Sequence, residues 1–131
     1  MTFTVQRLDH VVLKIADRER ALAFYRDMLG CRIERDRPEL GLIQLRAGTS
    51  QVDLVLRRDP VPPGSAQNMD HFCVRIDPFD EVAIRAHLAR HGIAPGPVSP
   101  RFGADGTGPS MYISDPDGNM VELKGPPSTL T

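Results

Sequence analysis

The sequence predicts an α+β fold built from two βαβββ modules, and three observations support this prediction. An eight-residue strand pattern at 8–15 returns at 69–76, with an apolar residue, Asp and His at the same places. Each copy precedes apolar residues at helical spacing that stop at a glycine, and then further strand patterns. A turn signal at 115–118 joins the last two strands into a hairpin. An internal repeat of this size indicates that both halves fold alike.

The first half is expected to form a strand, a helix and three more strands. Residues 8–15 alternate between apolar and mixed side chains, as a half-buried strand does. Asp17 is placed to cap the helix that follows, and Gly30 stands where a left-handed residue ends one. The three remaining strands are expected at 32–35, 42–46 and 51–56.

The second half repeats this order after the strand at 69–76. Its expected elements are a helix that starts at Asp77-Pro78 or at Asp80 and ends at Gly92, an edge strand interrupted by prolines over 93–98, a glycine-rich loop over 101–109 and a closing hairpin over 110–124. In the last strand Val121 and Leu123 share one face, and Glu122 lies on the other. The sequence leaves open whether that carboxylate is solvated or held inside.

A chain of 131 residues is expected to form one domain over 1–131. The prolines and small residues between the two copies indicate a linker that joins two packed modules. The expected limits are module 1 at 6–57, the linker at 58–68, module 2 at 69–125 and a C-terminal tail at 126–131.

Composition excludes several classes of partner. The formal net charge is −1, which gives no sign of nucleic-acid binding. No apolar run approaches the roughly 18 residues that a membrane span needs. Cys31 and Cys73 have no metal-ligand spacing, so we expect reduced thiols in a cytoplasmic protein without nucleic-acid or membrane partners.

Four polar residues recur at matching places in the two halves. His10 and His71 occupy the first strand of each half, and Asp53 and Glu122 occupy the last. Strand alternation turns their apolar neighbours toward the helix and these four groups toward the opposite face. A lone strand His or Glu is more often a surface residue than a ligand, but the repetition favours a site. Two imidazoles with one or two carboxylates suit one Zn, Ni, Mn, Fe or Co ion. Cys73 lies roughly 6.6 Å along the strand from His71, too far to be assumed a ligand.

The chain resembles the vicinal-oxygen-chelate superfamily, which includes glyoxalase I, fosfomycin-resistance proteins, extradiol dioxygenases, methylmalonyl-CoA epimerase and bleomycin-resistance proteins. The residues that carry the resemblance lie at 8–11, 24–30, 70–71, 115–119 and 121–123. The resemblance implies glyoxalase-like modules, each a curled mixed sheet with its helix on the convex face and a cleft on the concave face. It also implies one divalent metal ion, a small-molecule substrate and, commonly, a homodimer.

By this resemblance His10, His71 and Glu122 fall on metal-ligand positions. Asp53 falls on a fourth position, where glyoxalase-type members carry Glu. Its shorter side chain could bind the metal, act as a base through a water or support a ligand from outside. Glu122 and Asp53 are the expected catalytic residues.

The stretch before the last hairpin resembles the one in fosfomycin-resistance proteins where hydroxyl groups help to hold a phosphonate. Ser110 and Tyr112 are two residues apart in one strand, so their side chains point to the same face and both could face the cleft. Arg101 lies where a cation could meet an anionic substrate. The plainer reading is a polar loop with one exposed arginine.

The expected function is a divalent-metal-dependent enzyme that acts on a small substrate with adjacent oxygens, as a glyoxalase-like lyase or isomerase. Three alternatives stay open at this stage. They are thiol or water addition of the fosfomycin-resistance type, an extradiol-type dioxygenase, and small-molecule binding without catalysis, as in bleomycin-resistance proteins.

Overall fold

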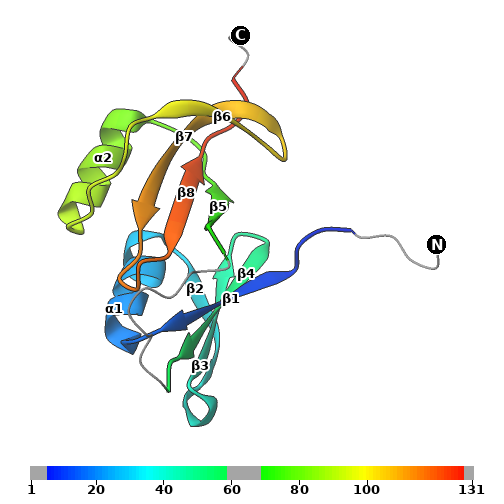
Figure 1. Ribbon diagram of the computed structural model, residues 1–131, viewed down its shortest axis with the longest axis vertical. Helices are drawn as coiled ribbons and strands as arrows, with labels where there is room; N and C mark the ends of the chain where they lie inside the picture. Colours follow the sequence, from blue (N-terminus) through cyan, green and yellow to red (C-terminus); the bar gives the residue numbers. More distant parts are fainter. Residues whose placement is uncertain (1–5, 59–68, 129–131) are drawn as a thin grey trace. The chain divides into compact units, whose positions relative to one another are not determined.

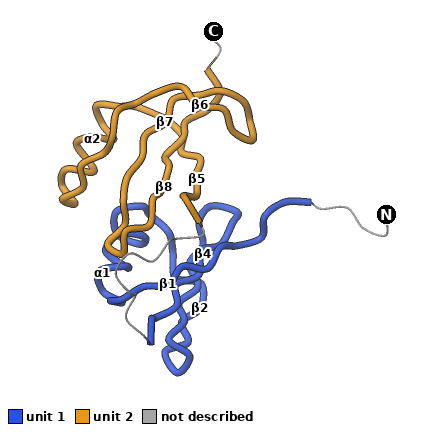
Figure 2. The backbone as a smooth tube through the Cα atoms, viewed as in Figure 1, with its two compact units in different colours: residues 1–61 blue, residues 62–131 orange. Residues whose placement is uncertain are grey.

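The computed structural model describes residues 6–58 and 69–128. Its chain divides into two compact units, residues 1–61 and residues 62–131 (Figure 2). Each unit holds a four-stranded mixed sheet and a helix (Figure 1). The prediction of two βαβββ modules is therefore confirmed. Most of the expected linker, and the end of the expected tail, lie outside the described residues.

Unit 1 follows the predicted order of elements. They are β1 (His10–Ile15), α1 (Arg18–Leu22), the π-helical segment η1 (Ala23–Met28), β2 (Arg32–Arg37), the 3₁₀ turn η2 (Pro38–Leu40), β3 (Leu42–Ala47) and β4 (Ser50–Leu56). The sheet has the order β1-β4-β3-β2, in which β1 runs parallel to β4 and the other neighbours are antiparallel. The parallel pair brings the first and last strands of the unit side by side.

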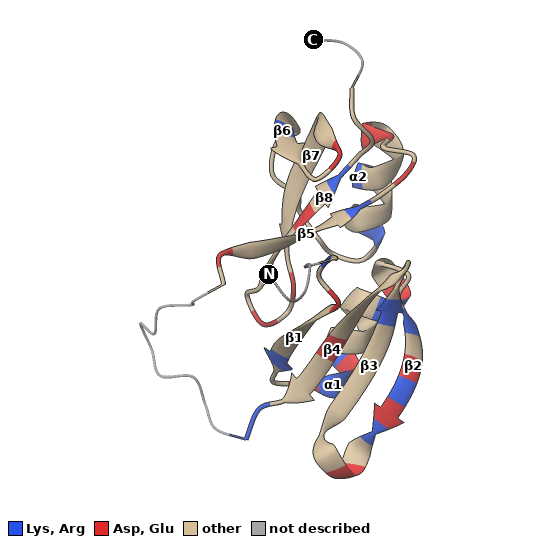
Figure 3. Cartoon of the chain, turned by 90° about the vertical axis from the view of Figure 1, so that its right-hand side faces the viewer, with Lys and Arg blue, Asp and Glu red and all other residues tan. Residues whose placement is uncertain are grey.

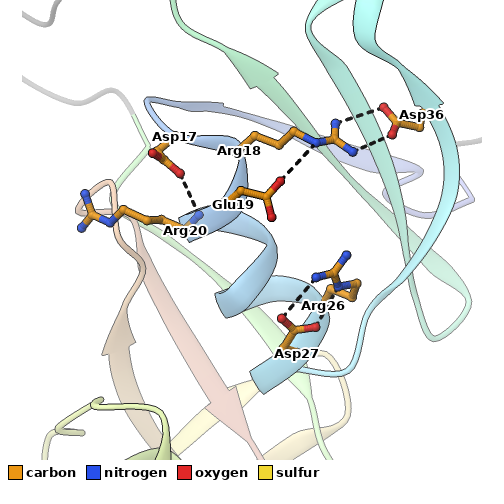
Figure 4. Close-up of polar contacts among 7 residues, drawn as sticks. All are labelled: Asp17, Arg18, Glu19, Arg20, Arg26, Asp27 and Asp36. Atoms are coloured by element: carbon orange, nitrogen blue, oxygen red, sulfur yellow. Dashed lines mark hydrogen bonds and ion pairs between the residues drawn. The ribbon is translucent and has the colours of Figure 1, made fainter.

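The helix of unit 1 begins as predicted, but it changes its winding. Asp17 accepts a hydrogen bond from the Arg20 amide, 2.9 Å from its carboxylate (Figure 4). From Ala23 onward the turns widen, and the Leu29 amide donates to the carbonyl of Phe24 five residues earlier. The wider turn accommodates two adjacent aromatic rings that are both buried, Phe24 and Tyr25. Sequence periodicity alone predicts one continuous α-helix here.

The outer strand β2 is strongly charged, with cations and acids next to one another along it (Figure 3). Such charges protect an exposed edge from pairing with another chain. Arg18 forms a two-pronged ion pair with Asp36 at 2.6 and 3.1 Å, which ties the start of α1 to this edge (Figure 4).

Unit 2 has the same topology. Its elements are β5 (His71–Arg75), α2 (Glu81–Arg90), β6 (Ser99–Gly103), β7 (Gly106–Ser114) and β8 (Met120–Lys124). The sheet order is β5-β8-β7-β6, with β5 parallel to β8. The turn between β7 and β8 forms as expected. There the Asp115 carboxylate accepts hydrogen bonds from the Asp117 and Asn119 amides, and Gly118 has φ +83°.

Of the two helix starts that the sequence offers, Asp80 is the one that forms, and its carboxylate caps α2. Two other predictions for unit 2 are wrong in position. Residues 93–98 form no strand, because Pro95 and Pro97 lack the N–H groups that a ladder needs. The pairing starts instead at Ser99, so the expected glycine-rich loop at 101–109 is mostly the β6–β7 hairpin.

The buried apolar side chains of each sheet alternate with the polar ones. In unit 1 they come from one face of the sheet and from the helix: Leu13, Ile15, Ile43, Leu45, Val52, Leu54, Leu22, Phe24, Tyr25 and Met28. In unit 2 they are Met111, Ile113, Val121, Leu123 and Leu88. The polar residues of the predicted site therefore occupy the other face of each sheet.

Replacing Gly108 by Ala is expected to destabilise the protein by about 1–3 kcal/mol. A Cβ there would lie 2.6 Å from the Pro126 carbonyl oxygen, which is backbone and cannot turn away. Gly96→Ala is the matched control, since its nearest neighbour lies at 3.8 Å and its φ is not positive. Chemical denaturation of both variants measures the difference, and equal stabilities would contradict the close approach.

Candidate metal centre and substrate face

The strand register gives the two predicted acids equivalent positions. In unit 1 Asp53 lies opposite Val12 of β1 and Gln44 of β3. In unit 2 Glu122 lies opposite Cys73 of β5 and Tyr112 of β7. Each histidine stands two residues before the partner of its acid on the parallel strand. Both carboxylates are largely buried, with 5% of Asp53 and 6% of Glu122 exposed.

In unit 2 the imidazole of His71 lies between two carboxylates. Its Nδ1 is 2.7 Å from Asp70 Oδ2, and its Nε2 is 3.3 Å from Glu122 Oε1. A proton on Nδ1, donated to Asp70, leaves the Nε2 lone pair facing a carboxylate oxygen. A nitrogen lone pair and a carboxylate oxygen repel each other at 3.3 Å unless a proton or another cation lies between them. The pair therefore has the chemistry of a cation site.

Unit 1 repeats the first half of this arrangement. His10 Nδ1 lies 2.9 Å from Asp9 Oδ2. This hydrogen bond raises the pKa of His10 above its usual value; partial loss of water opposes the shift, and the charge of Asp53 adds to it. Sequence reasoning missed these roles of Asp9 and Asp70, although the Asp-His pair in both halves was the available signal. A carboxylate that orients a metal-binding imidazole is a common second layer of such sites.

Removing the Asp70 carboxylate is expected to free Nδ1 of His71. In Asp70→Ala the 15N shift of this nitrogen should change, because it loses the hydrogen-bond partner that lies 2.7 Å away. Asp70→Asn should stay closer to the wild-type shift, because its amide oxygen still accepts the bond. The Asp70 side chain is 95% exposed, so neither change should disturb folding. Identical shifts in wild type and Asp70→Ala would contradict this role.

Two glutamines hold the Asp53 carboxylate. Gln51 Nε2 donates to one oxygen at 2.8 Å, and Gln44 Nε2 donates to the other at 3.3 Å. Both glutamines come from the same face of the sheet, on β4 and β3. The neutral side-chain amides of the two glutamines therefore orient the Asp53 carboxylate. The sequence analysis did not predict this feature. Each oxygen keeps a second lone pair for a metal, a water or a substrate proton.

Cys73 stands directly across from Glu122 in the parallel pair. Its thiol is surface-accessible and donates a long hydrogen bond to the Val74 carbonyl oxygen at 3.8 Å, but surrounding protein removes water from part of it. Burial first, and then the charge of Glu122, raise the pKa of Cys73 to about 11. Sequence spacing placed this thiol away from the site, whereas the register places it beside the acid.

Alkylation of Cys73 by iodoacetamide should therefore be slow at pH 8 and should accelerate up to about pH 11, because only the thiolate reacts. Glu122→Gln removes a negative neighbour, so the pKa should fall and the rate at pH 8 should rise. Mass spectrometry of the labelled peptide follows the rate. A rate that saturates near pH 8.5 would contradict this environment.

The residues predicted to bind substrate form one connected group in unit 2. Arg101 Nη1 donates to the backbone oxygen of Ser110 at 3.0 Å and to its Oγ at 2.6 Å. The same guanidinium lies over the ring of Tyr112, 4.5 Å from its centre. The ring of Tyr112 packs edge-on against His71 at 5.2 Å. Ser110 is fully buried, so it positions Arg101 and does not itself reach outward. Burial, then the carboxylate of Glu122, raises the pKa of Tyr112.

The structure brings the predicted residues together within each unit. His71, Glu122, Tyr112, Arg101 and Ser110 are neighbours in unit 2, and the charge of Asp53 acts on His10 in unit 1. In residues 6–58 and 69–128, no group of three or more His, Cys, Asp or Glu side chains could hold a metal ion. His10 belongs to unit 1 and His71 to unit 2, so the four-ligand set stays a prediction.

The chemical types of the donor atoms in the two units nevertheless suit a divalent metal ion. Each unit supplies one imidazole, whose Nδ1 is engaged by an aspartate, and one buried carboxylate. This mixture of nitrogen and oxygen donors suits Zn, Ni, Mn, Fe or Co, while Cys73 adds a softer donor beside Glu122. These are the donor types of the ligand set that the sequence predicts, His10, His71, Glu122 and Asp53.

A family model decides the wider relationship. The model of the Glyoxalase/Bleomycin resistance protein/Dioxygenase superfamily matches residues 7–123. The chain belongs to this superfamily. The resemblance inferred from the sequence motifs is thereby confirmed, and so is the glyoxalase-like fold.

Relatives within the superfamily have diverse descriptions. The chain is 31% identical over 124 residues to virulence protein STM3117 of Salmonella typhimurium, covering 91% of this chain and 83% of that protein. It is 30% identical over 121 residues to catechol-2,3-dioxygenase of Bacillus subtilis, covering 88% of this chain but only 40% of the dioxygenase. Human mitochondrial methylmalonyl-CoA epimerase is 28% identical over 131 residues, with 90% and 73% covered. The superfamily thus contains enzymes of more than one reaction class.

Solved structures agree on the fold. An integron cassette protein from the mobile metagenome of V. Pseudocholerae superposes with a TM-score of 0.76 at 28% identity, covering 95% of this chain and 98% of that one. The crystal structure of STM3117 gives a TM-score of 0.75 at 23% identity, covering 95% of this chain and 99% of that one.

In the part of the chain that the structure describes, neither helix has the length and apolar character to cross a membrane.

Proposed function

We propose that this superfamily member is a divalent-metal-dependent enzyme that acts on a small substrate with adjacent oxygens, as a glyoxalase-like lyase or isomerase. The observation that carries the proposal is the His71–Glu122 pair, with Nε2 and Oε1 3.3 Å apart and Nδ1 engaged by Asp70. The matching Asp9–His10 pair and Asp53 in unit 1 supply the same donor types.

A bound divalent ion would supply Lewis acidity toward two neighbouring substrate oxygens and stabilise the negative charge of an enolate or alkoxide. The protein's own contribution is to orient the donors and move a proton. Asp70 and Asp9 orient their imidazoles, and the buried carboxylate of Glu122 faces His71.

Asp53 fits the role of the proton-moving carboxylate. Its direction is set by Gln44 and Gln51, so it does not depend on a metal for orientation. A carboxylate held in this way can take a proton from a carbon next to a polarised carbonyl and return it to a neighbouring position. Glu122, which lies against His71, fits better as a ligand.

The experiment is proton exchange in D₂O. Protein loaded separately with Zn, Ni, Mn, Co or Fe(II) is mixed with hydroxyacetone or with the hemithioacetal of methylglyoxal and glutathione. We expect NMR to show loss of the α-C–H signal, abolished by a chelator and slowed about 10²–10⁴-fold in Asp53→Asn. Glu81→Gln, which alters a surface ion pair on α2, is the matched control. A protein that takes up none of these ions would refute the proposal.

The dioxygenase relative supports a second candidate, in which the iron-loaded protein inserts oxygen into a catechol. The same preparations separate the two. Ring opening of catechol under air by the Fe(II) form alone would favour the dioxygenase, whereas proton exchange with several metals would favour the isomerase or lyase.

We further propose that the protein works as a homodimer in the cytoplasm, with a small-molecule substrate. Both cysteines are free thiols, Cys31 buried and Cys73 accessible, in keeping with a reducing compartment. Light scattering after gel filtration should give twice the 14.5 kDa chain mass; a mass of one chain at micromolar concentration would contradict the dimer.

A further inference from the structure

The end of α2 carries two histidines that the proposed reaction does not use. His87 lies in the last turn of the helix, and His91 is its C-terminal cap residue, four positions later. Residues four apart on a helix are neighbours on one face. The two imidazole rings accordingly lie side by side, with 4.9 Å between their centres and 59° between their planes. This pair lies wholly within unit 2 and shares no residue with the predicted metal centre.

The backbone at the end of α2 holds the two histidines in place. The His91 and Ile93 amides both donate to the Leu88 carbonyl, at 3.0 and 2.9 Å. Gly92 has φ +73°, the left-handed conformation in which many helices end. The Leu88 side chain, between the histidines in sequence, is 1% exposed and anchors the turn. Both histidines therefore start from fixed backbone positions, and only their side-chain torsions need to adjust when a ligand binds.

The spacing of the two rings suits two ligands of one metal ion. When two imidazoles bind one ion through nitrogens about 2.0–2.1 Å away, at an angle between about 90° and 109°, their ring centres lie roughly 4.4–5.1 Å apart. The observed separation of 4.9 Å falls within this range. The same i, i+4 spacing on a helix places the two zinc-binding histidines of the H-E-x-x-H motif.

An ion can reach this pair from solvent, and the helix end favours positive charge. His91 is exposed and His87 is half-buried. The carbonyl groups at the C-terminal end of a helix give it partial negative charge. Arg90 is the opposing cation, three residues after His87, but its side chain is exposed and long enough to extend into water. Water would fill the positions of the ion that the two imidazoles leave open.

Two imidazoles completed by water favour an ion late in the first transition series. Affinity for such a site rises from Mn to Cu(II) and falls again at Zn, and Cu(II) accepts a planar arrangement of nitrogen and oxygen ligands. With two protein ligands, the pair should hold Zn, Ni or Co far more weakly than a centre with three or four. The two kinds of site should therefore fill at different concentrations of free ion.

We infer that His87 and His91 form a second metal site on unit 2, which binds Cu(II) in preference to Ni(II) and Zn(II). The inference does not depend on the proposed function, because it uses neither the predicted centre nor its substrate.

The test locates copper on the full chain by NMR. Cu(II) is paramagnetic and broadens the signals of nearby nuclei, so small additions up to two equivalents should weaken the amide signals of residues 87–92. Copper at the predicted centre would act instead on the signals around His10 and His71, so the two sites are read separately. The same titration of His10→Ala/His71→Ala follows the pair on α2 alone. His87→Gln and His91→Gln should each lower its affinity roughly 10-fold or more, because two linked ligands bind far better than one.

The matched control keeps the number of histidines and changes their spacing. In Ala89→His/His91→Gln the two imidazoles stand two residues apart and face different sides of the helix. Its affinity should fall as far as in the single variants, and it should remain folded because Ala89 is exposed. Arg90→Gln removes the neighbouring cation and should bind Cu(II) at least as tightly as the wild type.

Two outcomes would overturn the inference. They are the absence of copper-dependent broadening on α2 in the wild type, and an affinity of Ala89→His/His91→Gln equal to that of the wild type. Copper on α2 without any ion at the predicted centre would keep this inference and refute the proposed function. An ion at the predicted centre without copper on α2 would do the reverse.

Discussion

Replacing Glu122 by Gln is expected to lower the affinity for divalent metal at least 100-fold. The change keeps the size of the side chain but removes the charge that faces Nε2 of His71 at 3.3 Å. Loss of groups that merely support metal ligands weakens binding 10–100-fold, so loss of a ligand should exceed that range. Calorimetric titration with Zn or Mn measures the effect.

The control for this variant is Glu81→Gln, which removes a carboxylate of the same type from the surface of α2. It should bind metal like the wild type. Because a neutral Gln in place of a buried carboxylate does not leave a charge unpaired, Glu122→Gln should remain folded. An unchanged metal affinity in a folded Glu122→Gln protein would remove Glu122 from the ligand set.

Truncating Tyr25 to Ala is expected to destabilise the protein by about 3–5 kcal/mol, the usual range for a large buried aromatic residue. Tyr25 has no exposed surface, and its ring packs edge-on against Phe24 with 4.8 Å between centres. Loss of this ring leaves a cavity at the π-helical segment of unit 1. Val82→Ala, at a position 81% exposed, should change stability by less than about 0.5 kcal/mol. Urea denaturation compares them, and similar midpoints would show that the region can collapse onto the gap.

The elements predicted most accurately are those with a strong local signal. The alternation of 8–15, the cap at Asp17 and the turn at 115–118 each rest on chemistry within a few residues, and all three form. The repeated strand pattern predicted a second unit with the same topology. These features need no knowledge of distant contacts.

The misplaced elements depend on pairing partners that lie far along the chain. A strand at 93–98 has suitable apolar residues, but Pro95 and Pro97 cannot donate to a ladder. The glycines of 103–108 resemble a loop until the pairing of β6 with β7 gives them partners. The helix also widens at Ala23–Met28, where Phe24, Tyr25 and Met28 are buried. The spacing of apolar residues in the sequence does not indicate this widening.

For the candidate site, the alternation of side chains along each strand predicted the face on which a residue lies, but it did not predict which residues of other strands lie beside it. The parity of Glu122 was clear, whereas the proximity of Cys73 follows from the register of β5 against β8. The glutamines on Asp53 and the burial of Lys124 depend on several strands at once. A sequence shows such groups only as scattered polar residues.

The most direct test of the central claim is the number of metal ions bound per chain. Equilibrium dialysis against Zn, Ni, Mn, Co and Fe(II) should give one ion per chain for the wild type, whether the units pair within one chain or across two. The double variant His10→Ala/His71→Ala should bind none at this site while remaining folded. No bound ion in the wild type, or an equal number in the double variant, would contradict the account.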